Sequence, residues 1–390
     1  MADLAATTFE GYRRADGRVG VRNHVLVLSP TGLTSAAAAR ISALVRGTIC
    51  VTTGYGRGQV SDDARLQFDT LSGLACHPNI AATVVVSAGP DITKSYVDAI
   101  AATGKPVLGF SLPDVHEDAL ALVDAGVRAA TRMVRAASQL RREACAVREL
   151  CIAVECGHSD ASSGLVGNPL VGMLAEWVVA QGGQAMFSET VEWTGAEHLL
   201  ARRAVDADVA GQIVGAVMRR ERMVREAGGD IRAQNPGPQN NAGGLTTIEE
   251  KALGAVSKGG KQAIQGLLQP AQRPAAAGLY LMDTPFFSPE SITAMVAGGA
   301  QLVLFTTGAG NSYCSLVAPT IKVSGNPQAC ARLTEQIDLD ASGVVLGTTS
   351  IESRAREAMD QLLGVASGTL TFGEIVGEGT EVVSRLGPSM

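Results

Sequence analysis

The chain has 390 residues, of which 46% are hydrophobic and only 4% aromatic, and its formal net charge is −6. The length and hydrophobic content allow a sizeable core and predict two domains, and the acidic balance, with no run rich in Lys or Arg, argues against nucleic acid as a partner. We judge the apolar stretches too short for a membrane-spanning helix and find no signal-peptide core, so we expect a cytoplasmic protein with no membrane partner.

Cysteine usage also indicates the cytoplasm. The seven cysteines are spread singly along the chain with no CxxC pair, which argues against a disulfide framework and against a structural zinc site. Most of these thiols are expected to be small core residues. Cys156 differs because polar residues follow it directly.

Predicted strands and helices alternate from the start of the chain. The predicted strands cover residues 25–28, 49–52, 82–87 and 106–111. The predicted helices cover residues 36–45, 65–71, 91–102 and 114–142, and a Gly-rich loop covers 53–59. Because the last helix is amphipathic, we expect it to close a first domain, an N-terminal α/β domain over residues 1–145.

The stretch 150–167 is the most informative part of the sequence. Residues 152–154 predict a buried strand, and Cys156, His158, Ser159 and Asp160 follow in the loop that leaves it. In open α/β sheets, ligands bind at this carboxyl end of the strands. The alternative is a strand-to-helix turn in which Ser159 or Asp160 only caps the next helix.

The alternation continues to the C-terminus. The predicted strands cover residues 184–187, 279–282, 301–305 and 319–323. The predicted helices cover residues 170–181, 197–203, 208–226, 291–297, 327–336 and 352–365. This pattern predicts an α/β fold in which a second domain, residues 146–390, has a parallel sheet with helices on both faces.

Two loops of the second domain are candidate ligand loops. Residues 234–244 lead into a helix that Thr246 or Thr247 can cap, so we expect a shaped loop rather than a flexible linker. Residues 307–312 lack the third glycine of a dinucleotide motif, because Tyr313 stands there, and they favour an anion cradle over a nicotinamide site. The sequence motifs of nucleophile-elbow hydrolases and of P-loop proteins are absent.

A metal site is one chemistry that these residues permit. Thiolate and imidazole suit Fe(II) or Zn(II), so Cys156 and His158 are candidate ligands, with a hard oxygen from Glu189, Glu192 or Glu250. The alternatives are a buried cysteine, a packed histidine and glutamates on a solvated loop.

Two further side chains have a possible role in binding or proton transfer. Lys251, beside Glu250, is a candidate base for the proton α to a carboxylate, and a solvated helix pair is the alternative. Arg22 is one of several arginines before the first strand, and it either binds a carboxylate or sulfonate in bidentate fashion or is solvated.

Five long blocks of the chain follow one another in a recognisable order. They are GYRRADGRVGVRNHVLVL, ECGHSDASSGLVGNP, FSETVEWTGAEHLLARRA, NPGPQNNAGGLTTIEEKALGAVSKGGK and MDTPFFSPESITAMVAGGAQLVLFTTGAGNSY. Together they resemble the large-subunit core of the altronate/galactarate dehydratase family of lyases, over nearly the whole chain. The resemblance implies a β-elimination, usually the iron-dependent loss of water from a sugar acid. It also implies a Rossmann-like second domain that holds the metal, and a first domain that serves dimerisation, so we expect a homodimer or a higher oligomer.

The resemblance and the residue chemistry together predict a site for a divalent metal, expected to be Fe²⁺, and a hydroxy-acid substrate. The predicted metal ligands are Cys156, His158, Glu189 and Glu192. The predicted catalytic residues are Asp160, Glu250 and Lys251. The predicted substrate-binding residues are Arg22, Ser159, Asn168, Asn240, Gly243, Gly244, Gly308 and Gly310.

The chain also departs from the sugar-acid dehydratases. His158 stands where they have Gly, and Ala309 stands where many have Arg. The first half is closer to the large subunit of sulfolactate sulfo-lyase, another branch of the family. The small N-terminal β-clip (SAF-like) domain is missing, which implies a separate small subunit.

The predicted function is a metal-dependent lyase that removes the β substituent, expected to be water, from a small 2-hydroxy acid and leaves a 2-keto acid. One alternative is sulfite as the leaving group, as in the sulfo-lyase branch. An alternative of another class is a ligand-binding module without catalysis.

Overall fold

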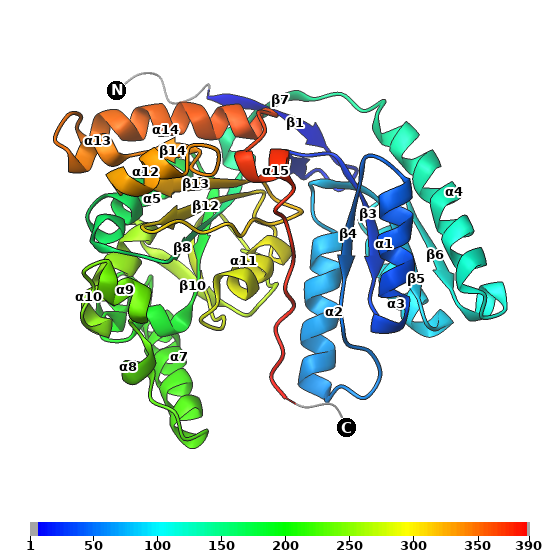
Figure 1. The fold of residues 1–390 in the computed structure, drawn as a ribbon, viewed down its shortest axis with the longest axis horizontal. Coiled ribbons are helices and arrows are strands. Elements are labelled where there is room, and N and C mark those ends of the chain that lie inside the picture. The colour runs from blue at the N-terminus through cyan, green and yellow to red at the C-terminus, as the bar shows by residue number, and fades with distance from the viewer. Residues whose placement is uncertain (1–6, 388–390) are drawn as a thin grey trace.

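Two parallel sheets, each flanked by helices, form the two lobes of the molecule (Figure 1). The structure is a computed structural model that describes residues 7–387. The first part of the chain forms the smaller lobe, and residues after β7 (Glu143–Ala146) form the larger lobe and the C-terminal tail. The predicted α/β fold class is confirmed.

The smaller lobe has a four-stranded parallel sheet in the order β4-β3-β5-β6. Its strands are β3 (His24–Ser29), β4 (Thr48–Thr52), β5 (Ile80–Ser87) and β6 (Val107–Ser111). Its helices are α1 (Ser35–Leu44), α2 (Ser61–Ala75), α3 (Pro90–Ala101) and α4 (Ala119–Ala137), with the 3-10 turns η2 (Gly32–Thr34) and η3 (Pro113–Val115). All four strands lie within two residues of their predicted bounds, because short apolar runs between turn residues favour buried parallel strands.

Helix α4 is shorter than the predicted 114–142. The Asp118 carboxylate accepts hydrogen bonds from two backbone N–H groups of the first turn, and this cap starts the helix at Ala119. Directly before the cap, His116 and Glu117 have left-handed φ values of 54° and 63°, which an α-helix does not tolerate. An amphipathic pattern does not reveal such a local break.

A three-stranded antiparallel sheet in the order β2-β1-β7 joins the lobes. Besides β7 it contains β1 (Thr8–Arg13) and β2 (Val19–Gly20), and the 3-10 turn η4 (Val147–Glu149) follows β7. Phe9 of β1 pairs with Cys145 of β7, and both lie in the same core cluster as Leu150 of the larger lobe. The sequence did not predict this sheet, because the charged residues around β7 are typical of a linker.

The larger lobe has a seven-stranded sheet in the order β10-β11-β9-β8-β12-β13-β14, with every neighbouring pair parallel. The strands are β8 (Cys151–Gly157), β9 (Gln184–Phe187), β10 (Ile264–Leu268), β11 (Gly278–Met282), β12 (Leu302–Thr307), β13 (Thr320–Ser324) and β14 (Leu339–Asp340). Without β10, this is the strand order of the doubly wound dinucleotide-binding folds. Such folds bind ligands where the order reverses, which here is the carboxyl end of β8 and β12.

Helices cover both faces of the larger sheet (Figure 1). Alternate residues of β8 pack on α5 on one face and on α11 on the other. The helices are α5 (Asn168–Ala180), α6 (Glu197–Ala201), α7 (Ala207–Glu226), α8 (Ile231–Gln234), α9 (Pro238–Ala242), α10 (Ile248–Ala255), α11 (Ser288–Ala297), α12 (Pro327–Arg332), α13 (Ser342–Val345), α14 (Ile351–Ala366) and α15 (Phe372–Val376). Shorter turns are the π-helical η5 (Ser163–Gly167) and the 3-10 turns η6 (Thr190–Trp193) and η7 (Val256–Gly259).

The helical run Ser163–Ala180 is long and apolar enough, by length and composition, to cross a membrane, contrary to the expectation from the sequence. Leu170, Val171 and Leu174 of this run are fully buried in the core of the larger lobe. Packing against the sheet accounts for the apolar composition, because a helix buried in a protein core can be as long and as apolar as a membrane-spanning helix.

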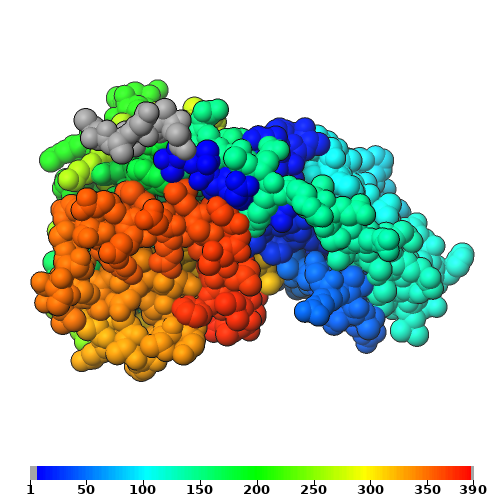
Figure 2. Space-filling model, turned by 90° about the horizontal axis from the view of Figure 1, so that it is seen from above, coloured from blue at the N-terminus to red at the C-terminus, as the bar shows by residue number. Residues whose placement is uncertain are grey.

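The C-terminal tail connects the lobes a second time. After α15 the chain runs as an extended segment between the lobes and ends beside α2 (Figure 1). There the buried Asp63 carboxylate accepts hydrogen bonds from the backbone N–H groups of Leu386 at 2.6 Å and Gly387 at 2.9 Å. Viewed from above, the first described residues of the chain lie over the junction of the lobes (Figure 2). The segments at both ends of the described residues, 7–387, therefore connect the lobes.

Candidate active site

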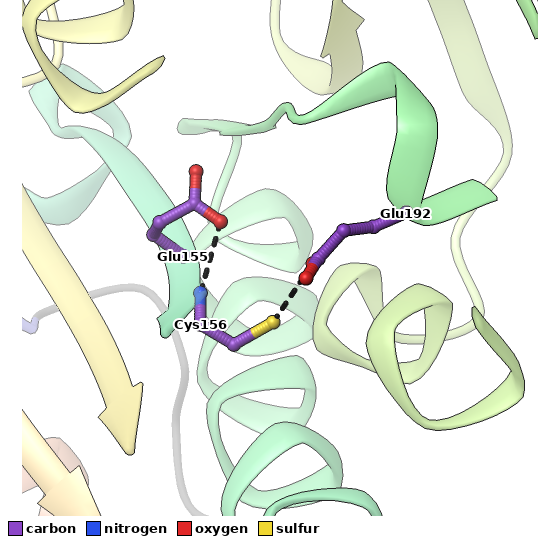
Figure 3. Close-up of side chains that lie close together, drawn as sticks. All are labelled: Glu155, Cys156 and Glu192. Carbon is purple, nitrogen blue, oxygen red and sulfur yellow. Dashed lines mark hydrogen bonds between the residues drawn. The ribbon is translucent and has the colours of Figure 1, made fainter. Parts of the chain in front are cut away.

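The carboxyl end of β8 presents a buried cluster of acidic and thiol groups. Glu155 and Cys156 lie near the end of β8, and Glu192 lies in η6, which follows the neighbouring strand β9. The Cys156 thiol donates a hydrogen bond to Glu192 Oε2 at 3.1 Å (Figure 3). One ligand atom from each of the three residues lies within 4.8 Å of the other two, so the cluster could hold a metal ion.

The Glu155 carboxylate is fully buried and is hydrogen-bonded on both oxygens. Oε1 accepts hydrogen bonds from the Cys156 backbone N–H at 2.9 Å and from Lys258 Nζ at 2.8 Å. Oε2 accepts hydrogen bonds from the hydroxyl groups of Ser188, at 3.1 Å, and Ser291. Four donors satisfy the lone pairs of a carboxylate, so Glu155 is the least available of the three as a metal ligand.

Two buried lysines balance the acidic groups. Lys258 Nζ, in η7, lies 2.8 Å from Glu155 Oε1 and 3.3 Å from both Cys156 Sγ and Glu192 Oε2. Lys251 Nζ, in α10, lies 3.2 Å from Glu192 Oε1. Since an unpaired charge at this depth costs several kcal/mol, these ion pairs are a condition for burying the carboxylates.

The surroundings shift the pKa values of the cluster in opposite directions. Burial, followed by the charge of Glu192, raises the pKa of the Cys156 thiol well above its ordinary value. Burial and the charges of Glu155 and Glu192 likewise raise the pKa of Glu189. Burial also acts to raise the pKa of Glu192, but the two lysines outweigh it and lower that pKa. Among the acidic groups Cys156, Glu189 and Glu192, it is therefore Glu192 that is ionised.

The residues fit a divalent metal. Glu189 Oε2 is buried and has no hydrogen-bond partner among residues 7–387. The Glu189 backbone has a left-handed φ of 65°. This conformation costs energy for a non-glycine residue and is found frequently at functional sites. The thiol of Cys156 and the carboxyl groups of Glu189 and Glu192 form a mixed soft and hard donor set, which suits Fe(II) or Zn(II).

The cluster opens onto a cavity of about 360 Å³. The lining residues come from the loops at the carboxyl ends of the strands and are Cys156, Gly157, His158, Glu189, Glu192, Gln234, Gly237, Gln239, Asn240, Lys251, Phe286, Phe287, Ser288, Pro289 and Asn311. Phe286 and Phe287 are 42% and 53% exposed, and Lys251 Nζ lies 4.6 Å from the centre of the Phe286 ring. One wall of the cavity is therefore aromatic.

His158 lies at the edge of the cavity in an exposed position. Its Nδ1 lies 2.8 Å from the Gly310 carbonyl oxygen, so Nε2 is the ring nitrogen that is left for a ligand. The backbone N–H groups of Gly308 and Ala309 both donate to the His158 carbonyl oxygen at 3.2 Å. These bonds tie the β12 loop to the β8 loop, and the Ala309 side chain faces solvent.

Asp160 is buried and caps the helical turn that follows it. Its Oδ1 accepts hydrogen bonds from Ser162 Oγ at 2.6 Å and from the Ser163 backbone N–H at 3.0 Å, and its Oδ2 accepts one from Asn326 Nδ2 at 2.6 Å. A Cβ atom at Gly243 or Gly308 would lie 2.6 Å or 2.2 Å from the Asp160 side chain. These two glycines thus make room for a capping aspartate, which matches the alternative that the sequence left open.

The loop after α9 is shaped around Ser159 and Asn240. Asn240 lines the cavity, and its Nδ2 donates to the Ser159 carbonyl oxygen at 2.8 Å. Ser159 Oγ is buried and lacks a partner in the described part of the chain. Gly244 and Gly310 adopt left-handed φ values of 91° and 103°, which glycine adopts without strain. The structure thus brings Asn240 to the cavity, whereas Ser159 contacts it only through the backbone and does not line the cavity.

Three predicted site residues lie elsewhere. Asn168 is buried, and its Oδ1 accepts a hydrogen bond from the Thr306 hydroxyl at 2.5 Å. Its Nδ2 donates to the backbone of α10. Arg22 pairs with Glu374 at 2.5 Å and donates to backbone carbonyls, which ties the N-terminal segment to α15. The exposed Glu250 accepts hydrogen bonds from the backbone and hydroxyl of Thr246, so its carboxylate belongs to the helix cap. The structure does not bring these three side chains into the cavity.

Sequence reasoning missed Glu155, Lys258 and Asn235. Glu155 interrupts an apolar strand, and Lys258 follows Lys251 by seven residues, which is two helical turns. Asn235 Oδ1 accepts a hydrogen bond from Lys251 Nζ at 2.8 Å. A charged residue inside an otherwise buried strand was the available signal, since such a residue requires a buried partner.

Two family models match the chain. Residues 147–389 match the model described as D-galactarate/Altronate dehydratase, C-terminal. Residues 11–138 match the model described as D-galactarate dehydratase/Altronate hydrolase, second domain.

Individual relatives match over nearly the whole chain. The chain is 39% identical over 386 residues to (2R)-sulfolactate sulfo-lyase subunit beta of Chromohalobacter salexigens, a match that covers 98% of this chain and 99% of the relative. It is 30% identical over 391 residues to galactarate dehydratase (L-threo-forming) of Escherichia coli, covering 94% of this chain and 74% of the relative. It is 28% identical over 385 residues to altronate dehydratase of Escherichia coli, covering 96% and 77%.

Proposed function

Because the chain belongs to the D-galactarate/altronate dehydratase family and is a lyase, we propose that it removes the β substituent from a short 2-hydroxy acid in the cavity beside β8. The observation that carries the proposal is the convergence of Cys156, Glu189, Glu192 and Lys251 on one cavity at the topological switch point of the sheet. The thiol and carboxyl groups can bind a metal, and the lysine can serve as the base of a metal-assisted elimination.

The proposed leaving group is sulfite, from a three-carbon acid with a hydroxyl on Cα and a sulfonate on Cβ. This choice differs from the water expected from the sequence, and it is supported by 39% identity over the full length of a sulfo-lyase subunit, against 28% and 30% for the dehydratases. Water from a sugar acid is the second candidate, favoured by the family models.

The proposed elimination breaks the Cα–H bond and the Cβ–S bond. Lys251 Nζ, which pairs with Glu192 as an ammonium group in the free protein, first gives up one proton to solvent and then takes the proton from Cα. The electron pair of the broken C–H bond forms the Cα–Cβ double bond, and the Cβ–S bond breaks with its pair on the departing sulfite. The enol product then takes a proton on Cβ and loses the proton of its hydroxyl group, which gives the 2-keto acid. Asn235, which accepts a hydrogen bond from Lys251, orients the base.

The proposed ligands of a divalent metal are Cys156 and Glu192, which have ligand atoms within 4.8 Å of each other, together with Glu189 and His158 Nε2, which line the same cavity. The proposed ion is Fe²⁺, which accepts both thiolate and carboxylate ligands. When bound, the metal supplies Lewis-acid stabilisation of the negative charge that develops on the substrate carboxylate and hydroxyl as the proton leaves. These residues hold their donor atoms in place by burial and ion pairing.

A partner subunit is part of the proposal, because the relative from Chromohalobacter salexigens is named as a subunit. We propose that this partner is the small β-clip protein expected from the sequence. The division into domains at residue 145, the homodimer and the cytoplasmic location stay predictions.

The experiment measures release of keto acid and sulfite by anaerobically purified protein loaded with Fe²⁺, with and without the small subunit. The substrates are (2R)-sulfolactate, altronate and galactarate. We expect turnover of sulfolactate to exceed turnover of the sugar acids by at least about tenfold in kcat/KM. Release of keto acid from a sugar acid without sulfite from sulfolactate would replace the first candidate by the second, and no keto acid from any substrate would contradict both.

Adjacent residues of α10 provide the sharpest test of the base. Lys251→Met should retain the metal and lower kcat by about 10² to 10⁴, because it removes a proton acceptor and leaves the proposed ligands intact. Glu250→Gln is the matched control and should keep kcat within about twofold, because its carboxylate serves the helix cap. Equal turnover in both variants would remove Lys251 from the mechanism.

A further inference from the structure

We propose that Lys258 is a positioning residue that holds Cys156 and Glu192 ready for the metal, and that Glu155 is its counter-ion rather than a ligand. The proposal rests on the proposed function, because it concerns the same metal. Nothing in the similarity of the chain to its relatives assigns a role to either residue.

A single ammonium group donates hydrogen bonds to all three acidic and thiol groups of the cluster. Lys258 Nζ donates to Glu155 Oε1 at 2.8 Å and to both Cys156 Sγ and Glu192 Oε2 at 3.3 Å. The three groups come from β8 and η6, which are separated by more than thirty residues of chain. An ammonium group has three protons to donate, so these contacts use its whole capacity. Its position therefore sets the spacing of the sulfur and the carboxylate.

Lys258 cannot act directly on the substrate. Its side chain is 0% exposed, and it lies behind the cavity lining, which Lys251, Cys156 and Glu192 form on the open side. A catalytic lysine has to reach the reacting atoms. Burial therefore separates the two lysines into one that faces the substrate and one that supports the ligands.

Glu155 has the surroundings of a counter-ion. Besides Lys258 it accepts hydrogen bonds from Ser188, Ser291 and the Cys156 backbone. A metal would have to displace at least one of these donors to bind Glu155, whereas Glu189 Oε2 has no partner in residues 7–387 to displace. The favoured third ligand is therefore Glu189.

The backbone around Lys258 is fixed from the other side. A Cβ atom at Gly259 would lie 2.4 Å from Cε1 of Phe187 in β9, and Gly260 has a left-handed φ of 59°. Glycine at 259 leaves room for the Phe187 ring, so the turn that carries Lys258 packs closely against β9. Local sequence and tertiary contact thus direct the lysine to the cluster.

The direction of the effect on metal affinity distinguishes positioning from charge. If charge alone mattered, loss of a cation beside the site would tighten binding of a divalent metal, because ammonium and metal repel each other. If Lys258 positions the ligands, its loss weakens binding, because the sulfur and the carboxylate lose their common donor. Removal of a partner that orients metal ligands typically costs 10- to 100-fold in affinity.

The experiment titrates Co²⁺ into metal-free protein by calorimetry and by absorption, since sulfur-to-cobalt charge transfer reports thiolate ligation. The variants are Lys258→Met, the double variant Glu155→Gln/Lys258→Met, which leaves no unpaired buried carboxylate, and Lys261→Met as an exposed matched control. We expect at least about tenfold weaker Co²⁺ binding and weaker charge-transfer absorption in the first two, and wild-type values in the control. At saturating metal, kcat should fall and KM for the substrate should stay within about twofold.

Several results would overturn the proposal. Unchanged or tighter Co²⁺ binding in the double variant, with a wild-type thermal transition, would show that Lys258 does not position the ligands. Absence of Co²⁺ binding by the wild type would contradict both this proposal and the metal of the proposed function. Normal Co²⁺ binding by the wild type without keto-acid release would contradict the proposed reaction alone, and weaker binding in Lys258→Met would then still support Lys258.

Discussion

The two parallel sheets of this molecule end differently at their carboxyl edges. In the smaller lobe, Ser29 and Ser87 end β3 and β5, and their hydroxyl groups lie 2.8 Å from the Thr34 hydroxyl and 2.7 Å from the Thr93 hydroxyl. These neutral groups satisfy one another within a few residues of sequence. In the larger lobe, β8 ends in charged and thiol groups whose partners come from distant segments.

The comparison shows that topology provides a place for a ligand and that side chains decide how it is used. Both sheets are parallel, and both have an edge of the kind that binds ligands in doubly wound folds. Neutral hydroxyl pairs are buried at low cost, whereas Glu155 and Glu192 require two buried ammonium groups. The larger lobe therefore holds the buried charged groups, whereas these hydroxyl groups at the edge of the smaller sheet form neutral pairs.

The strongest change is expected at the carboxyl end of β8 in the larger lobe, where the proposed metal ligands lie. Cys156→Ala should lower the metal content of anaerobically purified protein to about a tenth or less, because it deletes a proposed ligand that contributes little to the core. Cys50→Ala, on β4 of the smaller lobe, is the matched control and should keep wild-type metal content. The measurement is metal analysis by mass spectrometry, together with circular dichroism. Full occupancy in Cys156→Ala would exclude this thiol as a ligand.

A smaller effect concerns the seam between the lobes, where His77 is buried. Its Nε2 lies 3.0 Å from the Ala300 carbonyl oxygen, and its Nδ1 accepts a hydrogen bond from the Asn79 backbone N–H at 3.1 Å. Burial, followed by the charge of Lys105, lowers the pKa of His77 well below 6.5. The unfolded chain therefore binds a proton at acidic pH that the folded chain does not.

Stability should fall as the pH drops below about 6.5, by up to roughly 1.4 kcal/mol per pH unit from this group, until the folded-state pKa is reached. His77→Gln keeps a donor and an acceptor without a titrating group. Urea unfolding between pH 7 and pH 5 should show a shallower decline in this variant than in the wild type. Parallel declines would show that His77 does not contribute to acid sensitivity.

The weakest change is expected at the carboxyl edge of the smaller sheet, where hydroxyl groups pair with one another. Ser87→Ala removes the hydroxyl that pairs with Thr93 and accepts from the Gly89 backbone N–H, and the loss of these hydrogen bonds should lower the free energy of unfolding by about 1 kcal/mol. Metal content and kcat should not change. Ser95→Ala, on the exposed face of α3, is the matched control and should lie within about 0.5 kcal/mol of the wild type. A loss of metal in Ser87→Ala would contradict the division of roles between the two edges.

Much of the fold follows from local pattern. The strands of the smaller sheet are confirmed within two residues, because apolar runs between turns specify buried parallel strands without reference to the rest of the chain. The antiparallel pair β1 and β7 was missed, because its partners are far apart in sequence and each is short and partly charged. Pairing of such strands is decided by the core that they cover, here through Phe9 and Cys145.

For the site, the local sequence indicated which residue types lie at the carboxyl ends of β8 and β9, and this was enough to name Cys156, Glu189 and Glu192 as candidates. Only the tertiary structure decided that Lys251 faces the cavity while Glu250 faces solvent, because a helix turns by about 100° per residue and adjacent side chains diverge. Only the tertiary structure paired Glu155 with Lys258, which are 103 residues apart. A buried charge is tolerated only with its partner, and no local pattern states which distant residue supplies it.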